Sequence, residues 1–193
     1  MENLKAAWSS MLPLSGAEGY AGALFEAFAI RTIQQGGNFT LRSLTDGKVQ
    51  DITLSIPCIE AGPIVVEGNN LTTDLVSYDD VRVKDGKAWS PRLLWPTTTN
   101  FPTFDCFYFH TGGEVYPLQM TIAEVHVLKN SGANQARIYF DGMFGGTNPD
   151  KHKAVFVVPK DIALHYKKQQ FKGKVDKKDC DMGQYFDQWV MGI

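Results

Sequence analysis

The sequence predicts one α/β domain in which helices flank a mixed central sheet. Its 193 residues, 44% hydrophobic and 21% charged, suit a single folded domain with a sizeable core. An apolar pattern of helical period comes first, and alternating runs of β type follow it. A short, continuous apolar run near the C-terminus then indicates a strand buried on both faces. We therefore expect one domain over residues 1–193, with a core at about residues 16–171.

The first expected helix lies within residues 15–37, "SGAEGYAGALFEAFAIRTIQQGG". Ser15 suits the N-cap, because Glu18 follows it at the spacing of a capping box, and two glycines end the pattern. Apolar residues recur at helical spacing and predict the face that packs on the core. Glu26 stands in the middle of this helix, on the border of the apolar stripe.

Two hairpins are expected after this helix. Residues 38–57 contain two alternating runs joined at Asp46-Gly47, a dipeptide that suits a type I′ turn. Residues 63–68 predict a further short strand. The second hairpin consists of an aromatic strand at residues 101–110, a turn with two glycines, and a return strand at 115–128. Pro117 cannot donate a ladder hydrogen bond, so an irregularity or a free side is expected there.

The C-terminal third alternates between helical and strand signals. Residues 130–152 predict a turn or short helix and then a Gly-rich loop, and residues 153–159 predict the buried strand. Asp161 in N-cap position predicts a helix at residues 161–171. The last residues, 181–193, predict either a helical turn or a final strand. The C-terminal basic helix and tail together span residues 160–193.

The net charge of −2 is unevenly distributed. Residues 151–193 carry nine Lys/Arg and five Asp/Glu, a net charge of +4, whereas residues 1–150 have a net charge of −6. A basic segment of this kind either meets a phosphate backbone or forms a solvated surface. Five lysines are the candidates for nucleic-acid binding: Lys153, Lys160, Lys167, Lys168 and Lys172.

The remaining composition argues against several classes of protein. The three cysteines are far apart and form no CxxC pair, which disfavours a disulfide framework or a thiolate zinc site. No apolar run approaches the length that crosses a bilayer, so no membrane partner is expected. The N-terminal residues lack the pattern of a signal peptide.

The second hairpin carries the candidate chemistry. Asp105 lies in its first strand, and Gln119 and Thr121 share one face of the return strand, because strand side chains alternate with a period of two. Two acids that converge from neighbouring strands can hold a divalent cation, and a lysine two residues further on can steady the reacting phosphate. This is the logic of the PD-(D/E)xK nuclease pattern, in which a glutamate from the preceding helix, here Glu26, often takes part. The alternative is that Asp105 has no catalytic role and simply lies near a turn or at a sheet edge.

Two of these positions depart from the nuclease pattern. Gln119 offers a neutral carbonyl oxygen, which binds a cation more weakly than a carboxylate does. Thr121 carries no charge and cannot replace an ammonium group beside the phosphate. The candidates to replace the missing nuclease residues are Glu124, His126 and Lys129, which lie downstream. His126 has the near-neutral pKa that suits a base, although Glu124 and His126 also fit ordinary surface or half-buried roles.

The segments "GYAGALFEAFAIRTIQQGGNFTLRSL" and "NFPTFDCFYF…VYPLQMTIAEVH" resemble the C-terminal nuclease-like domain of the Crinkler and retrotransposon-hot-spot superfamily. The resemblance extends from about Gly19 to Phe171. It implies a restriction-endonuclease-like fold, and it implies that Asp105, Glu26 and Gln119 are metal ligands for Mg²⁺ or Mn²⁺. Thr121 takes the position of the lysine.

The resemblance also implies a biological setting. Crinklers are effector proteins that are secreted into a host cell and act in its nucleus, and the retrotransposon-hot-spot proteins are largely nuclear or perinuclear. DNA and a host nuclear protein are therefore the expected partners. The family domain often follows an NTPase module and a trafficking header, but this sequence has no GxxxxGK[ST] motif.

Three functions remain open from the sequence. The first is a Mg²⁺-dependent endonuclease, a phosphodiester hydrolase with an altered site. The second is a catalytically inactive nuclease fold that binds nucleic acid or a host nuclear protein. The third is an unrelated α/β protein whose aromatic residues line a pocket for a small molecule or a peptide.

Overall fold

The computed structural model describes most of the chain in nine segments. They are residues 2–11, 13–14, 16–45, 50–59, 91–94, 103–110, 114–143, 152–175 and 178–193. The expected strand at residues 63–68 and the turn at Asp46-Gly47 lie outside them.

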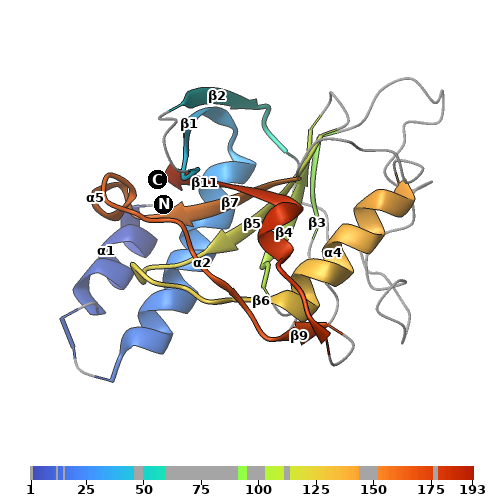
Figure 1. The fold of residues 1–193 in the computed structure, drawn as a ribbon. Helices are drawn as coiled ribbons and strands as arrows, with labels where there is room; N and C mark the ends of the chain where they lie inside the picture. Colours follow the sequence, from blue (N-terminus) through green and yellow to red (C-terminus); the bar gives the residue numbers. More distant parts are fainter. Residues whose placement is uncertain are drawn as a thin grey trace, which may run out of the picture.

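Seven strands form one mixed sheet in the order β2-β1-β11-β7-β5-β4-β3 (Figure 1). The strands are β1 (Gly37–Ser43), β2 (Asp51–Ile56), β3 (Arg92–Leu94), β4 (Cys106–Phe109), β5 (Val115–Met120), β7 (His152–Val158) and β11 (Phe186–Gly192). The three central strands, β5, β7 and β11, run parallel, and the outer strands pair antiparallel. The prediction of an α/β fold with a mixed central sheet is confirmed.

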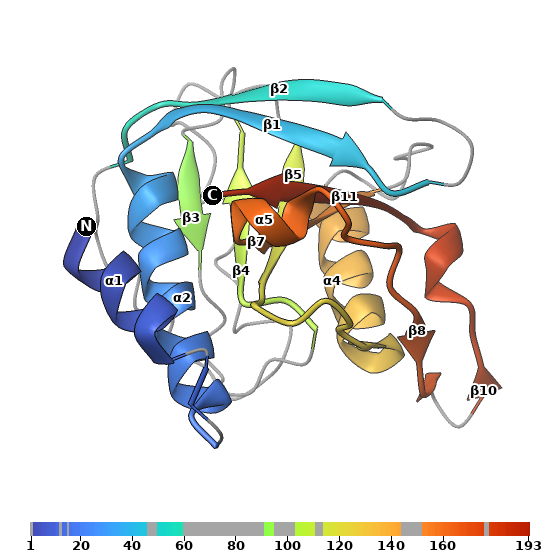
Figure 2. The same ribbon diagram turned by 90° about the vertical axis from the view of Figure 1, so that its left-hand side faces the viewer.

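Helices cover both faces of this sheet. The described α-helices are α1 (Glu2–Met11), α2 (Glu18–Gln34), α4 (Asn130–Met143) and α5 (Lys160–Ala163), and a 3-10 turn, η1, spans Met182–Gln184. Figure 2 shows α1 and α2 on one side of the strands and α4 on the other. Two further strand pairs, β6 (Leu128–Lys129) with β8 (Phe171–Lys172) and β9 (Lys174–Val175) with β10 (Lys178–Asp179), lie beside α4.

Each face of the sheet has its own core because successive strand residues point to opposite sides. Cys106 and Tyr108 of β4 pack with Phe25 of α2 in the first core. Phe107 and Phe109 pack in the second core with residues of α4, including Phe140. A shift of one residue in the β4–β5 pairing would exchange the two sets, so burial on both faces fixes the register.

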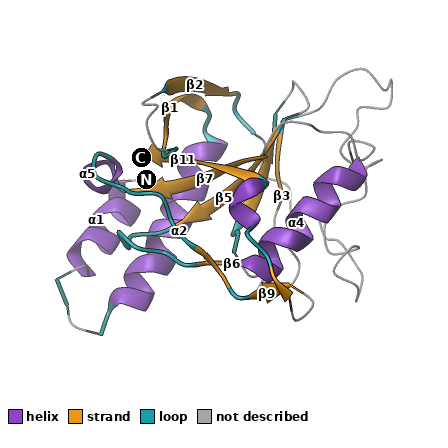
Figure 3. Cartoon of the chain, in the orientation of Figure 1, coloured by secondary structure: helices purple, strands orange, loops and turns teal. Residues whose placement is uncertain are grey.

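The described part of the chain confirms the main predicted elements. The first helix, both hairpins and the buried strand occur as α2, β1–β2, β4–β5 and β7 (Figure 3). Pro117 faces Phe107 in the hairpin, and the parallel pairing with β7 begins one residue later, at Leu118. This is the free side expected beside a proline.

Several predicted boundaries were wrong. The return strand of the second hairpin ends at Met120 and not at residue 128, so Thr121 lies just beyond it. Helix α2 begins at Glu18, after Ala17 in N-cap position, and Ser15 lies outside the described residues. Residues 130–143 form a full helix, α4, where a turn or short helix was expected. Of the two alternatives for the C-terminal residues, the strand is the one that forms, at residues 186–192. The sequence interpretation did not identify α1.

The prediction of a basic helix at residues 161–171 was also wrong. Helix α5 has only four residues, with Pro159 in N-cap position, and the chain then runs as a loop to β8 (Figure 3). Contacts with distant residues hold this loop. Arg42 donates from Nη2 to the carbonyl oxygens of Ala163 and Tyr166, at 2.5 and 3.2 Å. Gln188 and Gln169 exchange two hydrogen bonds between side chain and backbone. These bonds satisfy backbone groups that a longer helix would have paired internally.

Candidate functional site at the open end of the central hairpin

Asp105 and Gln119 meet at the end of the β4–β5 hairpin that is opposite its turn. The pairing of Cys106 with Leu118 brings the residue before β4 beside Gln119, the penultimate residue of β5. Gln119 Nε2 donates to Asp105 Oδ2 at 2.8 Å, and the backbone N–H of Met120 donates to the same oxygen at 2.6 Å. The two positions predicted from sequence are therefore in direct contact.

The surroundings of Asp105 favour its protonated form. Burial is the largest influence and raises the pKa of Asp105, and the negative charge of Glu26 raises it further. The hydrogen bonds from Met120 and Gln119 act in the opposite direction, and the result is a pKa of about 7. Near neutral pH this carboxyl exchanges its proton readily, which is a property often found at functional sites.

Glu26 reaches this region from helix α2. Its carboxyl is half-buried, and burial raises its pKa. The charge of Glu26 acts on both Asp105 and the neighbouring Cys106. Cys106 is fully buried, and burial, followed by these two carboxylates, raises the pKa of its thiol well above the usual value. The structure thus places Asp105 and Gln119 in contact and Glu26 close enough for its charge to act on Asp105, and Cys106 is a neighbour that the sequence interpretation missed.

Thr121 and His126 lie in the loop that follows β5. The Thr121 N–H donates to the Val157 carbonyl, and its hydroxyl oxygen accepts from the Ala123 N–H at 3.0 Å. His126 donates its backbone N–H to Gln169 Oε1 at 2.6 Å, and burial lowers the pKa of its imidazole. The lowered pKa favours the neutral form of the imidazole, which can accept a proton.

The five candidate lysines are spread over the molecule and do not form one helical face. Lys153 is on β7, where its Nζ lies 2.6 Å from Glu114 Oε1 and above the ring of Tyr116. Lys160 begins α5, whereas Lys167 and Lys168 lie exposed on the loop after it, and Lys172 lies exposed on β8.

The lysine-bearing loop is attached to the loop that follows the hairpin. Gln169 donates from Nε2 to the carbonyl oxygens of Glu124 and Lys167. The exposed side chains of Lys167 and Lys168 thus belong to a segment held against the loop that leaves Thr121 and contains His126. No sequence pattern signals this contact, because Gln169 and Glu124 are 45 residues apart.

The donor set of the site consists of two carboxylates and one amide. Among the described residues, no group of three or more His, Cys, Asp or Glu side chains is placed to hold a metal ion. Gln119 supplies the third side chain, and its Nε2 also lies 3.4 Å from the Met120 carbonyl oxygen. If its amide turned over, the Gln119 carbonyl oxygen would point toward Asp105, and oxygen ligands are those that Mg²⁺ prefers.

Three comparisons with known proteins produced no match. Neither a protein-family model, nor a curated protein, nor a solved structure matched this chain. Within the described residues, no helix is long and apolar enough to cross a membrane.

Proposed function

We propose that this chain is a nuclease-like domain that acts on DNA phosphodiesters with a divalent cation at an altered PD-(D/E)xK site. The observation that supports it is the contact of Asp105 with Gln119 at the open end of the hairpin, within the electrostatic reach of Glu26. The order of elements, α2, the β4–β5 hairpin, the crossover helix α4 and strand β7, suits the restriction-endonuclease-like fold that the sequence resemblance implies.

The residues of the site fit Mg²⁺ or Mn²⁺. Asp105 and Glu26 would contribute carboxylate oxygens, and Gln119 would contribute an amide oxygen with its NH₂ group turned away from Asp105. Such a cation supplies Lewis-acid activation of a phosphoryl oxygen and lowers the pKa of bound water. Binding the cation requires Asp105 to lose its proton. Because its pKa is about 7, loss of that proton costs little at slightly alkaline pH.

Other residues have roles in binding and proton transfer. Lys167 and Lys168, exposed on their loop, hold the phosphate backbone, and Lys172 extends this contact from β8. Neutral His126, on the loop next to them, accepts a proton. Lys153 contributes less, because Glu114 already neutralises it. Thr121 offers no positive charge, so the rate falls below that of a site with lysine.

The test is cleavage of supercoiled plasmid with Mg²⁺ or Mn²⁺. We expect nicking by the unmodified chain and a loss of at least about 100-fold for Asp105→Ala. Glu18→Gln is the matched control, because Glu18 is an exposed acid on the same helix as Glu26. The double variant Gln119→Glu/Thr121→Lys restores the full motif and should cut faster. Cleavage that survives Asp105→Ala contradicts the proposal. So does a cleavage rate that neither Asp105→Ala nor the double variant Gln119→Glu/Thr121→Lys changes.

A second function is favoured by one specific observation, namely that the polar groups of the site already satisfy one another. Asp105 accepts from Gln119 and Met120, and the Thr121 hydroxyl accepts from Ala123. On this alternative the chain is a nuclease fold without catalysis that binds nucleic acid or a host nuclear protein. It predicts plasmid retardation without nicking, unchanged in Asp105→Ala and lost in the charge reversal Lys167→Glu/Lys168→Glu.

The cellular setting follows from the sequence resemblance alone. We propose an effector that acts in a nucleus, in a host cell if the full-length protein is secreted. Expression of a fluorescent fusion in host cells tests this, and uniform exclusion from the nucleus would count against it.

A further inference from the structure

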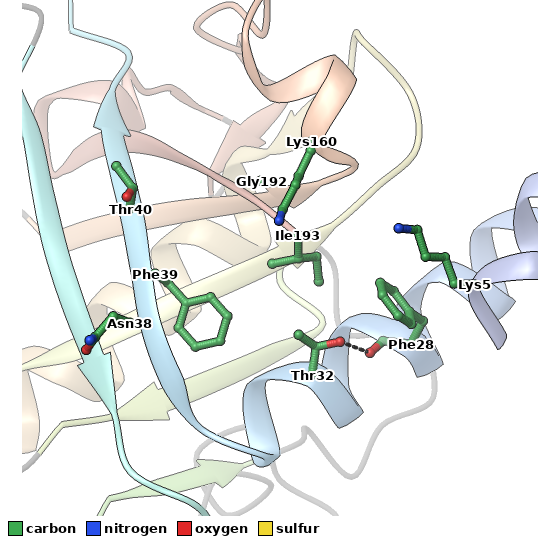
Figure 4. A pocket seen from close by; sticks show the side chains of 9 residues that line it. All are labelled: Lys5, Phe28, Thr32, Asn38, Phe39, Thr40, Lys160, Gly192 and Ile193. Atoms are coloured by element: carbon green, nitrogen blue, oxygen red, sulfur yellow. Dashed lines mark hydrogen bonds between the residues drawn. The ribbon is translucent and has the colours of Figure 1, made fainter. Parts of the chain in front are cut away.

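A pocket of about 470 Å³ lies beside the ends of the central strands, at the junction of α1, α2, β1, α5 and the last residues of β11 (Figure 4). Its size is within the range of small-molecule sites in proteins. Nine residues line it: Lys5, Phe28, Thr32, Asn38, Phe39, Thr40, Lys160, Gly192 and Ile193.

Two lysines from different elements extend toward this pocket. Figure 4 shows Lys5 of α1 and Lys160 of α5 across the pocket from strand β1. Neither lysine has a salt bridge to a carboxylate within the described segments, unlike Lys153, which is paired with Glu114. Two ammonium groups at one small pocket favour a ligand that carries two negative charges.

The opposite wall is aromatic. Phe39 of β1 is only half-buried, so part of its ring is accessible to a ligand, whereas Phe28 of α2 is buried and lies beside Lys5 (Figure 4). A flat ring can lie against an exposed aromatic side chain, and such stacking tolerates different ligand rings.

One polar side chain of the pocket has unused hydrogen-bonding capacity. The Thr32 hydroxyl donates to the Phe28 carbonyl at 2.8 Å, so its oxygen can still accept. Asn38, next to Phe39 on β1, points to the other side of the strand, where its Oδ1 accepts from Ser55 Oγ at 2.7 Å (Figure 4). A ligand with a hydroxyl group between its charge and its ring matches the position of Thr32.

The pocket is built on fixed backbone. A Cβ at Gly192 would lie 2.9 Å from the Ala163 Cβ and 3.3 Å from the Lys160 Cα, so the end of β11 and helix α5 pack in direct contact. Arg42 holds the carbonyl oxygen of Ala163 at the end of the same helix. The backbone of Lys160 is therefore held in position, and only its side chain must order when a ligand binds.

We propose that this pocket binds a phosphate monoester that carries a flat ring, that is, a nucleoside monophosphate or the 5′-phosphorylated end of a nucleic-acid strand. Lys5 and Lys160 contact the phosphate, Phe39 stacks on the ring, and Thr32 contacts the sugar. This inference does not depend on cleavage at Asp105, and either one can fail alone.

The experiment is calorimetric titration of the full chain with AMP, followed by adenosine and inorganic phosphate separately. We expect saturable binding of AMP, and weaker binding of each fragment. Lys5→Gln and Lys160→Gln should each weaken AMP binding by about tenfold, the usual effect of losing one charge-assisted contact. Lys174→Gln, an exposed lysine on β9, is the matched control and should leave the affinity unchanged.

The variant Phe39→Leu separates the two halves of the site. It should weaken AMP and leave inorganic phosphate unaffected, and circular dichroism verifies that it folds. No saturable AMP binding, equal binding of phosphate and AMP, or lysine variants indistinguishable from Lys174→Gln would each overturn the proposal. Competition between AMP and a 5′-phosphorylated dinucleotide shows that strand ends are accepted, whereas its absence restricts the ligand to the free mononucleotide.

Discussion

The β4–β5 hairpin has one carboxylate near each end, and the surroundings shift the pKa values of these two carboxylates in opposite directions. At the turn, burial alone would raise the pKa of Glu114, but hydrogen bonds from Lys153 and Tyr116 and the charges of Lys153 and His110 lower it on balance. At the open end, Asp105 has hydrogen bonds from an amide and a backbone N–H, and the charge that acts on it is that of the Glu26 carboxylate.

The difference shows what a hydrogen bond can and cannot do for a buried acid. Neutral donors stabilise an anion, but at Asp105 they do not offset desolvation and a like charge. At Glu114, burial again has the largest single effect on the pKa, but the positive charge and hydrogen bond of Lys153 help to offset it. Among the described residues no positive charge offsets these effects at the open end, and a divalent metal ion is one species that would do so.

The largest expected effect is that of removing the charge of Asp105. The unfolded carboxyl ionises near pH 3.8 and the folded one near pH 7, so the folded state keeps the proton longer. The free energy of unfolding therefore falls as the pH rises from about 4 to 7 and stays low above that. Asp105→Asn keeps an oxygen acceptor but has no proton to lose. It should raise the unfolding free energy at pH 8 by roughly 2–4 kcal/mol and flatten this slope.

Urea denaturation of both proteins at pH 5 and pH 8 measures this effect. Equal differences between the two proteins at the two pH values would show that Asp105 titrates normally. Addition of Mg²⁺ at pH 8 should stabilise the unmodified chain and not Asp105→Asn, because a ligand that binds only the folded state raises its stability.

A smaller effect is expected for Gln119→Leu. This change removes one of the two hydrogen bonds to Asp105 and should lower the unfolding free energy by about 1 kcal/mol. Since the Gln119 bond lowers the pKa of Asp105, its loss should raise that pKa further above its normal range. A carbon-13 NMR titration of the Asp105 carboxyl measures the change, and a pKa that moves down would contradict the geometry.

Glu26→Gln should move the same pKa in the opposite direction. The charge of Glu26 raises the pKa of Asp105, so its removal should lower that pKa while the two hydrogen bonds stay in place. The same NMR titration detects this. Glu18→Gln serves as the control and should leave the titration of Asp105 unchanged.

The smallest effect is expected at the turn end. Lys153→Gln removes an ion pair whose side chains are 33% and 50% exposed, so the stability loss should not exceed about 1 kcal/mol and should shrink in high salt. The stability contributed by the lowered pKa of Glu114 is present at neutral pH and is lost as the pH falls through that pKa. Thermal unfolding over a series of pH values should therefore show a difference between the two proteins at pH 7 that shrinks as the pH falls.

The periodicity of the sequence was sufficient for much of the fold. Helix α2, both hairpins and strand β7 were predicted from local patterns, because each pattern reports which face of one element is buried. The 14-residue spacing of Asp105 and Gln119 across a short turn was enough to place them side by side, since hairpin register follows from local chain geometry.

The errors occurred where distant parts of the chain decide the conformation. Residues 164–170 have a helix-like composition, yet they form a loop, because Arg42 and Gln188 bond to the backbone of this region from other strands. The central position of β11 between β1 and β7 likewise depends on partners far away in the sequence. Propensity is a weak influence that such tertiary contacts override.

The sequence by itself determined which elements form and which polar residues the hairpin brings together. Only the tertiary structure decided the chemical state of those residues. The raised pKa of Asp105 arises from burial beneath packed elements and from a carboxylate on a helix 79 positions earlier in the chain. Desolvation and Coulomb interactions act through space, so the folded arrangement and not the local sequence sets their magnitude.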